Sequence, residues 1–229
     1  MTKFQRYAVY YAPPRGGALE AFGAAWLGWD VRIGASVSYP QIEGLPAPIS
    51  ELTATPRKYG FHGTLKPPFV LADGCTPADL RAGLERFAAE VSAFALERLV
   101  VSRLGGFVAL TPEGDTGPLS RLACGVVEAL EGYRAPLSAA ALAKRPAAGL
   151  SPRQEALLTR FGYPYVFDQF RFHMTLTGRL DGPVADAVRA RLEAHLAPIL
   201  AEPVPVADLA LFGEDAQGRF HEIDRVPLA

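Results

Sequence analysis

Two stretches of the chain repeat one pattern: Lys58–Lys66 reads KYGFHGTLK and Arg171–Arg179 reads RFHMTLTGR. Each contains His-x-Thr-Leu, and the two copies lie about half the chain apart. Polar and apolar residues alternate in both copies, which is the period of a strand with one face against a core. Pro67 and Pro68 follow the first copy and limit its length. The repeat therefore predicts two matching strands and a fold built around a β-sheet.

The two strands would present matching polar faces, because successive side chains of a strand point to opposite sides of the sheet. The polar face of the first strand carries His62, Thr64 and Lys66. That of the second strand carries Arg171, His173, Thr175, Thr177 and Arg179. A half-buried strand needs polar residues on its solvent side, but it does not need cations and hydroxyls at equivalent places twice. The repetition indicates a functional surface.

The rest of the chain supplies further strands and helices. Strands are expected at Arg6–Tyr11, at 99–110 as a pair around two glycines, and at 209–226 as a hairpin. Helices are expected at 18–29, at 119–130, and after the start signals at Thr76, Ser151 and Pro183. Residues 36–56, rich in Pro, Gly and Ser, are expected to form a long surface loop. Because strands and helices alternate without a regular βαβ rhythm, an α+β fold is favoured over a doubly wound parallel sheet.

Composition limits the class of protein. The 229 residues are 49% apolar, which is enough for one sizeable domain or two small lobes that share a core. With 23 basic and 24 acidic side chains the net charge is −1, so the basic surface of a protein that binds long nucleic acid is missing. Cys75 and Cys124 are too few for a disulfide framework. No stretch resembles a leader peptide or a membrane span, so we expect a soluble cytoplasmic protein that binds neither long nucleic acid nor membrane.

The paired motifs suit chemistry on a phosphodiester. Imidazole has an ordinary pKa of about 6.5 and can give or take a proton near neutral pH. If the two strands faced each other across a cleft, one histidine could activate water while the other protonates the departing oxygen. Thr64 and Thr175 could donate hydrogen bonds to phosphate oxygens, and the candidates for balancing phosphate charge are Lys66, Arg171 and Arg179. One His-x-Thr alone would fit an ordinary structural histidine equally well, whereas a second copy indicates catalysis.

The remaining histidines and the first tyrosines fit structural roles. His195 lies beside the apolar stripe of the last predicted helix. His221 and Glu222 would point to opposite faces of a strand, which argues against a shared metal ion. Tyr7 and Tyr11 share a face of the first strand and are expected in the core. Since neither motif has a third metal ligand beside it, we expect catalysis without a metal or other cofactor.

Paired His-x-Thr motifs at this separation resemble those of the 2H phosphoesterase superfamily, which includes RNA 2′,3′-cyclic phosphodiesterases and RNA ligase-like proteins. Residues 55–69 (TPRKYGFHGTLKPPF), 6–13 (RYAVYYAP) and 26–30 (WLGWD) resemble the branch associated with phosphonate-utilisation genes. The resemblance covers most of the chain. It implies a bilobal, pseudo-twofold α+β fold, with two antiparallel sheets forming a central cleft and helices on the outside. Residues 1–229 would then be a single domain of two intertwined lobes.

The resemblance also implies roles for the motif residues. By the superfamily's motif, His62 and His173 would be the catalytic pair, with Thr64 and Thr175 as donors to phosphate oxygens. The resemblance does not extend to the three cations, whose expected role rests on strand alternation alone. Gly63 departs from the larger residue that is usual after the first histidine, and a glycine there would loosen the strand.

The leading hypothesis is metal-independent opening of a small cyclic phosphodiester, such as a ribose cyclic phosphate formed in phosphonate breakdown. Two alternatives stay open: RNA end processing, by opening a 2′,3′-cyclic phosphate or by joining ends, and a phosphate-binding module without catalysis. The expected partner is a small phosphorylated substrate, with a nucleotide or a short RNA end among the candidates. The sequence decides neither which histidine is the base nor the oligomeric state.

Overall fold

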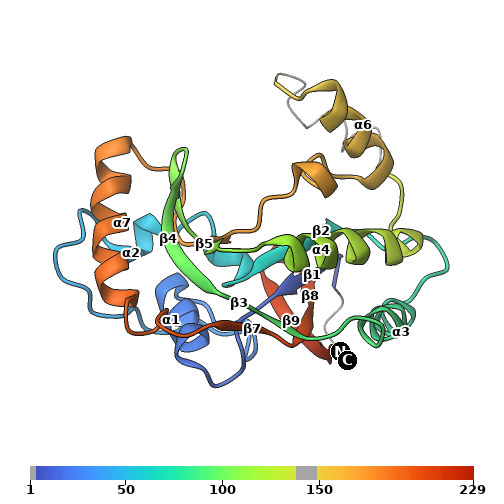
Figure 1. Ribbon diagram of the computed structural model, residues 1–229, viewed down its shortest axis with the longest axis horizontal. Coiled ribbons are helices and arrows are strands. Elements are labelled where there is room, and N and C mark those ends of the chain that lie inside the picture. The colour runs from blue at the N-terminus through green and yellow to red at the C-terminus, as the bar shows by residue number, and fades with distance from the viewer. Residues whose placement is uncertain (1–3, 138–148) are drawn as a thin grey trace.

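The computed structural model describes residues 4–137 and 149–229, which form an α+β fold around a large antiparallel sheet (Figure 1). The sheet has seven strands in the order β4-β5-β6-β2-β1-β8-β9. Its strands are β1 (Arg6–Tyr11), β2 (Gly63–Phe69), β4 (Arg98–Leu104), β5 (Phe107–Glu113), β6 (Met174–Thr175), β8 (Asp208–Glu214) and β9 (Phe220–Pro227). A separate two-stranded sheet pairs β3 (Phe94–Leu96) with β7 (Val204–Val206). The predicted α+β class with antiparallel sheets is confirmed.

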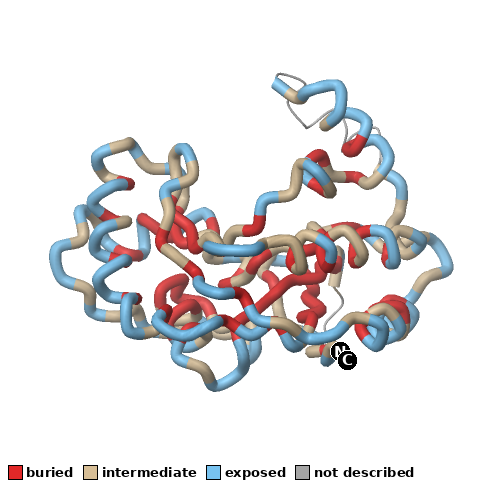
Figure 2. The backbone as a smooth tube through the Cα atoms, in the orientation of Figure 1, coloured by how far each residue is buried: buried red, intermediate tan, exposed pale blue. Residues whose placement is uncertain are grey.

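Helices surround the large sheet. The longer ones are α1 (Ala18–Leu27), α3 (Pro77–Ala88), α4 (Gly117–Ala129), α6 (Pro152–Phe161) and α7 (Gly182–Leu196). The short ones are α2 (Ile49–Leu52), η1 (Arg57–Tyr59), η2 (Glu131–Tyr133) and η3 (Phe167–Gln169). One apolar core joins side chains of α1, α3, α4 and α7 to the strands, and buried backbone accordingly concentrates in the middle of the molecule (Figure 2). Among the described helices, none has the length and apolar character needed to cross a bilayer.

Capping chemistry sets where α3 and α6 begin. The Thr76 hydroxyl accepts a hydrogen bond from the Asp79 amide, and the Asp79 carboxylate accepts one from the Thr76 amide. Ser151 and Gln154 form the same reciprocal pair before α6. A proline follows each cap, at a position where its missing N–H costs no helix hydrogen bond. Both predicted helix starts are therefore confirmed.

The central strand β1 is buried on both of its faces. Tyr7 and Tyr11 point into the large core, as predicted. Tyr10, which alternates with them, lies in a smaller apolar cluster on the other face, with Phe212 and Phe220. This second cluster gives the opposite side of the sheet a packed floor beside the first histidine motif.

The segment before the first motif is held in place by one arginine. Residues 36–56 are mostly irregular, as expected, but they include the short helix α2. The Arg57 guanidinium donates hydrogen bonds to the carbonyl oxygens of Leu27 and Ser50. Because η1 leads directly into the first motif, these bonds fix the approach of the chain to His62.

Candidate active site

The two His-x-Thr motifs are neighbours in one sheet. Strands β2 and β6 pair in antiparallel fashion, with Gly63 opposite Met174. These residues are also the first of their strands, so each motif histidine immediately precedes a strand. The expectation that the two motif strands face each other across a cleft is therefore corrected, because they lie side by side.

This pairing brings each histidine next to the other motif's threonine. Antiparallel partners run in opposite directions, so one step along each strand places Thr64 opposite His173. One step in the opposite direction along each strand places His62 opposite Thr175. All four residues point to the same side, since each is one residue away from the Gly63–Met174 pair. A compact set of two imidazoles and two hydroxyls results.

Gly63 is required by the packing of the second motif. A Cβ at this position would lie 2.3 Å from the Phe172 ring. Phe172 is 7% exposed and belongs to the large core. The missing side chain therefore lets an aromatic ring of one motif pack directly against the backbone of the other. The expectation that this glycine loosens the strand is corrected, because the ring fills the space.

The His62 ring is held by two hydrogen bonds and a stacked ring. Its Nδ1 lies 3.0 Å from the Gly60 carbonyl oxygen, which can only accept, so Nδ1 carries the hydrogen. In the neutral ring Nε2 then accepts from the Thr64 hydroxyl at 3.1 Å. Tyr10 stacks on the imidazole with ring centroids 3.7 Å apart and planes at 20°.

These surroundings favour the neutral form of His62. Burial lowers its pKa to about 4, and the nearby His173 adds to the effect. The hydrogen bond to the Gly60 carbonyl opposes both, because it favours the protonated ring. At neutral pH His62 is therefore uncharged and able to accept a proton.

The Nδ1 atom of His173 is held in the same way as that of His62. It lies 2.8 Å from the carbonyl oxygen of Arg171, two residues earlier, just as Gly60 precedes His62 by two. The Phe107 ring lies beside the imidazole, with centroids 5.7 Å apart. In the described part of the chain no group hydrogen-bonds to Nε2 of His173. This nitrogen is available to a ligand.

A cavity of about 310 Å³ opens on the motif face of the sheet. His62 and Thr175 line it, one from each motif. Tyr59 of η1 contributes another wall, with its ring 6.4 Å from the imidazole of His62. Thr177 also lines the cavity, but its hydroxyl already accepts from the Val108 amide and donates to the carbonyl of Gly178. Thr175 is thus better placed than Thr177 to bind a ligand.

Arg179 is the predicted cation that reaches this cavity. Its side chain is exposed, lines the cavity with His62 and passes over Gly106. No hydrogen bond or ion pair holds its guanidinium within residues 4–137 and 149–229. A guanidinium that is not paired can bind a phosphate group with two parallel hydrogen bonds.

Lys66 does not share the face of the two motifs. Tyr10 of β1 lies opposite Thr64, but the next β1 residue, Val9, lies opposite Lys66. Leu65 is therefore an extra residue in a β-bulge. The bulge reverses the alternation, so Lys66 shares the face of Val9, which belongs to the large core. The prediction that Lys66 joins the polar face of its strand is wrong.

The ammonium of Lys66 is bound elsewhere. It donates to the Val127 carbonyl oxygen at 3.1 Å and to Glu131 Oε2 at 3.0 Å. Lys66 is 2% exposed, and burial lowers its pKa while the bond to Glu131 counters that effect. A ligand in the His62 cavity would therefore not contact this side chain in the described arrangement.

Arg171 also lies away from the His62 cavity. Its guanidinium donates to the Phe170 carbonyl oxygen at 2.7 Å and more weakly to that of Asp168. The side chain lines a different cavity, together with Phe170 and Phe172. What Arg171 supplies to the site is its own carbonyl oxygen, which fixes the ring of His173.

Two aromatic residues of the site were not found from the sequence. Tyr10 stacks on His62, and Tyr59 lines the cavity. Alternation along the first strand does predict that Tyr10 points to the face opposite that of Tyr7 and Tyr11. However, nothing in the sequence says which strand lies beside the first motif, so the contact with His62 could not be predicted.

The other histidines have structural contacts. His195 is exposed on α7, with its ring 5.7 Å from Phe22. His221 Nε2 lies 2.7 Å from Asp215 Oδ2 in the last hairpin. Within residues 4–137 and 149–229 no three His, Cys, Asp or Glu side chains gather in a way that could hold a metal ion.

The fold and site define an α+β protein that carries two His-x-Thr pairs on one face of a sheet. The chain belongs to the family described as "Protein of unknown function (DUF1045)", whose model matches residues 64–221.

Curated relatives match nearly the whole chain. A protein of Janthinobacterium sp. (strain Marseille) named "Ribose 1,5-bisphosphate phosphokinase PhnN" is 38% identical over 230 residues, covering 98% of this chain and 51% of the relative. A protein of the same name from Laribacter hongkongensis (strain HLHK9) is 37% identical over 221 residues, covering 96% and 51%. The chain thus spans about half the length of these relatives.

Solved structures with a similar course of the chain have low sequence identity. One described as a phosphoesterase has a TM-score of 0.45 at 14% identity, covering 99% of both chains. E. coli LigT in apo form has a TM-score of 0.46 at 14% identity, covering 100% of this chain and 99% of LigT. Kluyveromyces marxianus Usb1 has a TM-score of 0.44 at 11% identity and covers 99% of both.

Proposed function

We propose that this chain is a metal-independent phosphoesterase that opens a small cyclic phosphodiester, with His62 and His173 as its acid–base pair. The observation that carries the proposal is the antiparallel pairing of Gly63 with Met174. It sets two imidazoles and two threonine hydroxyls on one face. Each imidazole has its Nδ1 bound to a backbone carbonyl, which leaves Nε2 for proton transfer.

The surroundings of the two histidines support different roles for them. His62 is neutral at pH 7, so it accepts the proton of the attacking water. As the water oxygen bonds to phosphorus, one ring ester bond breaks, and protonated His173 gives its proton to the departing oxygen. The Thr64 hydroxyl turns from Nε2 to a phosphate oxygen when substrate binds. Arg179 balances the charge that develops on those oxygens.

A small substrate fits the properties of the site. The cavity is about 310 Å³, which is the size of a small-molecule site. The net charge of −1 provides no broad basic surface for long nucleic acid. Relatives that share this region are named for ribose 1,5-bisphosphate. We therefore favour a ribose cyclic phosphate, in phosphonate or ribose-phosphate metabolism, as the substrate.

RNA end processing is the second candidate function. The half-buried Tyr59 at the cavity wall favours it, because an aromatic ring beside a phosphate site can stack on a base. A short RNA end needs few basic contacts, so the balanced charge argues only mildly against it. A phosphate-binding module without catalysis would bind the same ligands but would show no turnover at any pH.

The test is phosphorus NMR of the protein in the presence of a chelator. The panel contains ribose 1,2-cyclic phosphate, nucleoside 2′,3′-cyclic phosphates and short RNA with a cyclic end. Ring opening is expected, and His62→Ala and His173→Ala should each abolish it. His195→Ala, which changes an exposed histidine on α7, is the matched control and should keep the activity. Activity that disappears in chelator would contradict the metal-independent mechanism.

A further inference from the structure

One wall of the cavity beside His62 is built from a single short segment, residues 49–60, which contains α2 and η1 and which we name the wall segment. Four of its residues line the cavity: Thr55, Pro56, Tyr59 and Gly60. The segment ends at Gly60, whose carbonyl oxygen binds Nδ1 of His62. Its position therefore sets both the shape of the cavity and the orientation of the His62 ring.

The wall segment also contacts the second motif. The Gly178 amide, near the end of that motif, donates a hydrogen bond to the Leu52 carbonyl oxygen at 2.8 Å. A Cβ on Gly178 would lie 3.1 Å from the Thr55 hydroxyl oxygen, so the two stretches of chain are in close contact there. A displacement of the wall segment would therefore change the position of His62 relative to the second motif.

Arg57 joins the wall segment to the helix before it. Its Nε donates a hydrogen bond at 3.0 Å to the carbonyl oxygen of Leu27, the last residue of α1. Its Nη2 donates to the Ser50 carbonyl oxygen at 2.6 Å and to the Thr53 hydroxyl at 3.2 Å. The guanidinium also lies 5.6 Å from the centre of the Tyr39 ring. One side chain thus links α1, α2 and η1.

The bonds of Arg57 are directed hydrogen bonds to neutral oxygens. Its acceptors in the described chain are two carbonyls and one hydroxyl, with no carboxylate among them. The Leu27 carbonyl is one of the last four of α1, which a helix leaves without an intrahelical donor. A guanidinium carries five N–H donors in a rigid plane, so it can bind both carbonyls at once, whereas an ammonium on a flexible chain lacks this fixed geometry.

We propose that Arg57 is a positioning residue for the proposed base, His62: it holds the wall segment, and with it the carbonyl oxygen of Gly60 that orients the imidazole. This inference rests on the proposed function. Arg57 itself is not among the described residues that line the cavity, so it acts through the wall segment and not on the substrate. Proton transfer requires a base within hydrogen-bond reach of the attacking water, and a small misplacement lowers the rate strongly.

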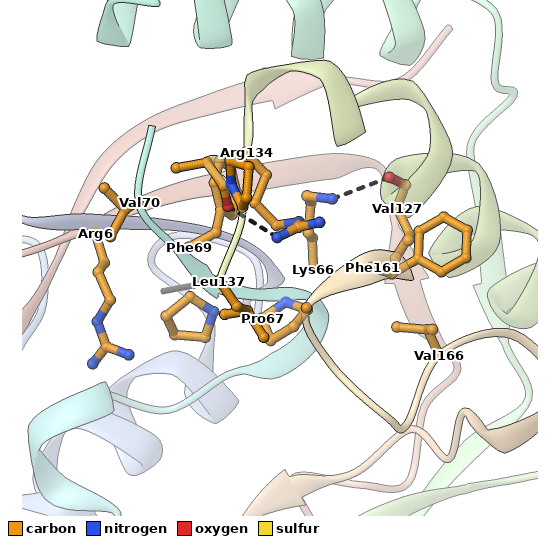
Figure 3. A pocket seen from close by; sticks show the side chains of 14 residues that line it. Arg6, Lys66, Pro67, Phe69, Val70, Val127, Arg134, Leu137, Phe161 and Val166 are labelled. Carbon is orange, nitrogen blue, oxygen red and sulfur yellow. Dashed lines mark hydrogen bonds between the residues drawn. The ribbon is translucent and has the colours of Figure 1, made fainter. Parts of the chain in front are cut away.

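Two substitutions of Arg57 and one control test this role. Arg57→Gln is too short to reach both backbone carbonyls, whereas Arg57→Lys keeps the length and the charge but not the planar fork. Arg134→Gln is the matched control, because Arg134 is also a half-buried arginine that donates to two backbone carbonyl oxygens, those of Ala135 and Arg160. It lines a different cavity, beside Lys66 (Figure 3). Melting temperatures identify the variants that fold, and if Arg57→Gln does not fold, Arg57→Lys is compared with the parent protein.

The first readout is nitrogen-15 NMR of the His62 imidazole in the absence of substrate. In the parent protein Nδ1 carries the hydrogen and Nε2 does not, so the two nitrogens should give well-separated signals at pH 7. Arg57→Gln releases the Gly60 carbonyl, and the ring should then exchange between its two tautomers, which brings the signals closer together. Arg57→Lys should show a smaller change and Arg134→Gln none.

The second readout is the separation of kcat from KM for ribose 1,2-cyclic phosphate. Arg57→Gln should lower kcat by about 10- to 100-fold, because the proposed base is misplaced. KM should change by less than about threefold, because the proposed phosphate contacts of Thr175 and Arg179 do not depend on the wall segment. Arg57→Lys should recover part of kcat, and Arg134→Gln should keep both parent values.

The two readouts separate this inference from the proposed activity. The NMR spectra decide whether Arg57 orients His62 even if no cyclic substrate is opened. Spectra like those of the parent in the folded Arg57 variants would overturn the inference, and turnover by the parent protein would then leave the activity standing. A full kcat in those variants would overturn the inference as well.

Discussion

The ring of Tyr10 lies face to face with the ring of His62, with centroids 3.7 Å apart. Tyr10 is 1% exposed and packs against Phe212 and Phe220, so it covers one face of the imidazole with apolar surroundings. Burial is the main cause of the lowered pKa of His62. This relationship distinguishes two histidines that the sequence presents as equivalent, and it supports the base role proposed for His62.

Removing the Tyr10 ring should raise the pKa of His62. Tyr10→Leu opens one face of the imidazole to water, and we expect the pKa to move from about 4 toward its ordinary value by about one pH unit. Tyr10→Phe keeps the ring and should keep the low pKa. Proton NMR titration of the His62 Hε1 resonance measures both. An unchanged titration in Tyr10→Leu would show that the stack does not control the charge of His62.

Acidification should destabilise the protein through His62. Its pKa is about 4 in the folded chain and about 6.5 when unfolded, so the unfolded state binds more protons between these values. The free energy of unfolding therefore falls as pH drops from 6.5 to 4, by about 1–3 kcal/mol from this group. Urea titrations at pH 7 and 4.5 should show a smaller loss in His62→Gln than in the parent protein. Equal losses would exclude His62 as the source.

Gly63 should not accept a side chain. Gly63→Ala brings a methyl group against the Phe172 ring, and we expect a loss of about 1–3 kcal/mol in the free energy of unfolding. Adding Phe172→Leu makes room, so the double variant should lose less than the sum of the single losses. Chemical denaturation of the four proteins gives the coupling directly. Additive losses would mean that the two motifs do not interlock at this point.

Arg179 should act on turnover and not on folding. Its guanidinium is exposed and has no partner in the described part of the chain, so Arg179→Gln should leave the melting temperature unchanged. Losing a charge-assisted bond to phosphate should lower kcat/KM by roughly 10- to 100-fold, with partial recovery in Arg179→Lys. Arg153→Gln removes another exposed arginine, on α6, and controls for surface charge. A full rate in Arg179→Gln would remove this residue from the site.

The sequence predicted most of the fold because its signals are local. A short aromatic and β-branched run that ends before prolines placed β1 correctly, and the capping pairs at Thr76 and Ser151 placed the starts of α3 and α6. The two histidines and two threonines were predicted from the repeated His-x-Thr motif, with its superfamily resemblance and strand alternation, and the structure places them on one face. Strand alternation and helix caps depend on residues within about four positions of one another, so they can be recognised in a single sequence.

The features that could not be predicted depend on pairing between distant strands. Alternation assigned Lys66 to the motif face, but a bulge at Leu65, visible only against β1, turns it to the other side. The contact of Tyr10 with His62 requires knowing that β1 lies next to β2. The sequence analysis expected Gly63 to loosen its strand. Its lack of a side chain is instead required by the Phe172 ring, which comes from the other half of the chain.

The pH dependence of kcat/KM for ring opening in chelator tests the central claim most directly. If neutral His62 accepts a proton and protonated His173 donates one, the profile should be bell-shaped. Its acid limb should lie near the pKa of about 4 for His62. A flat profile, or a bell that persists unchanged in His62→Ala, would contradict the two-histidine mechanism.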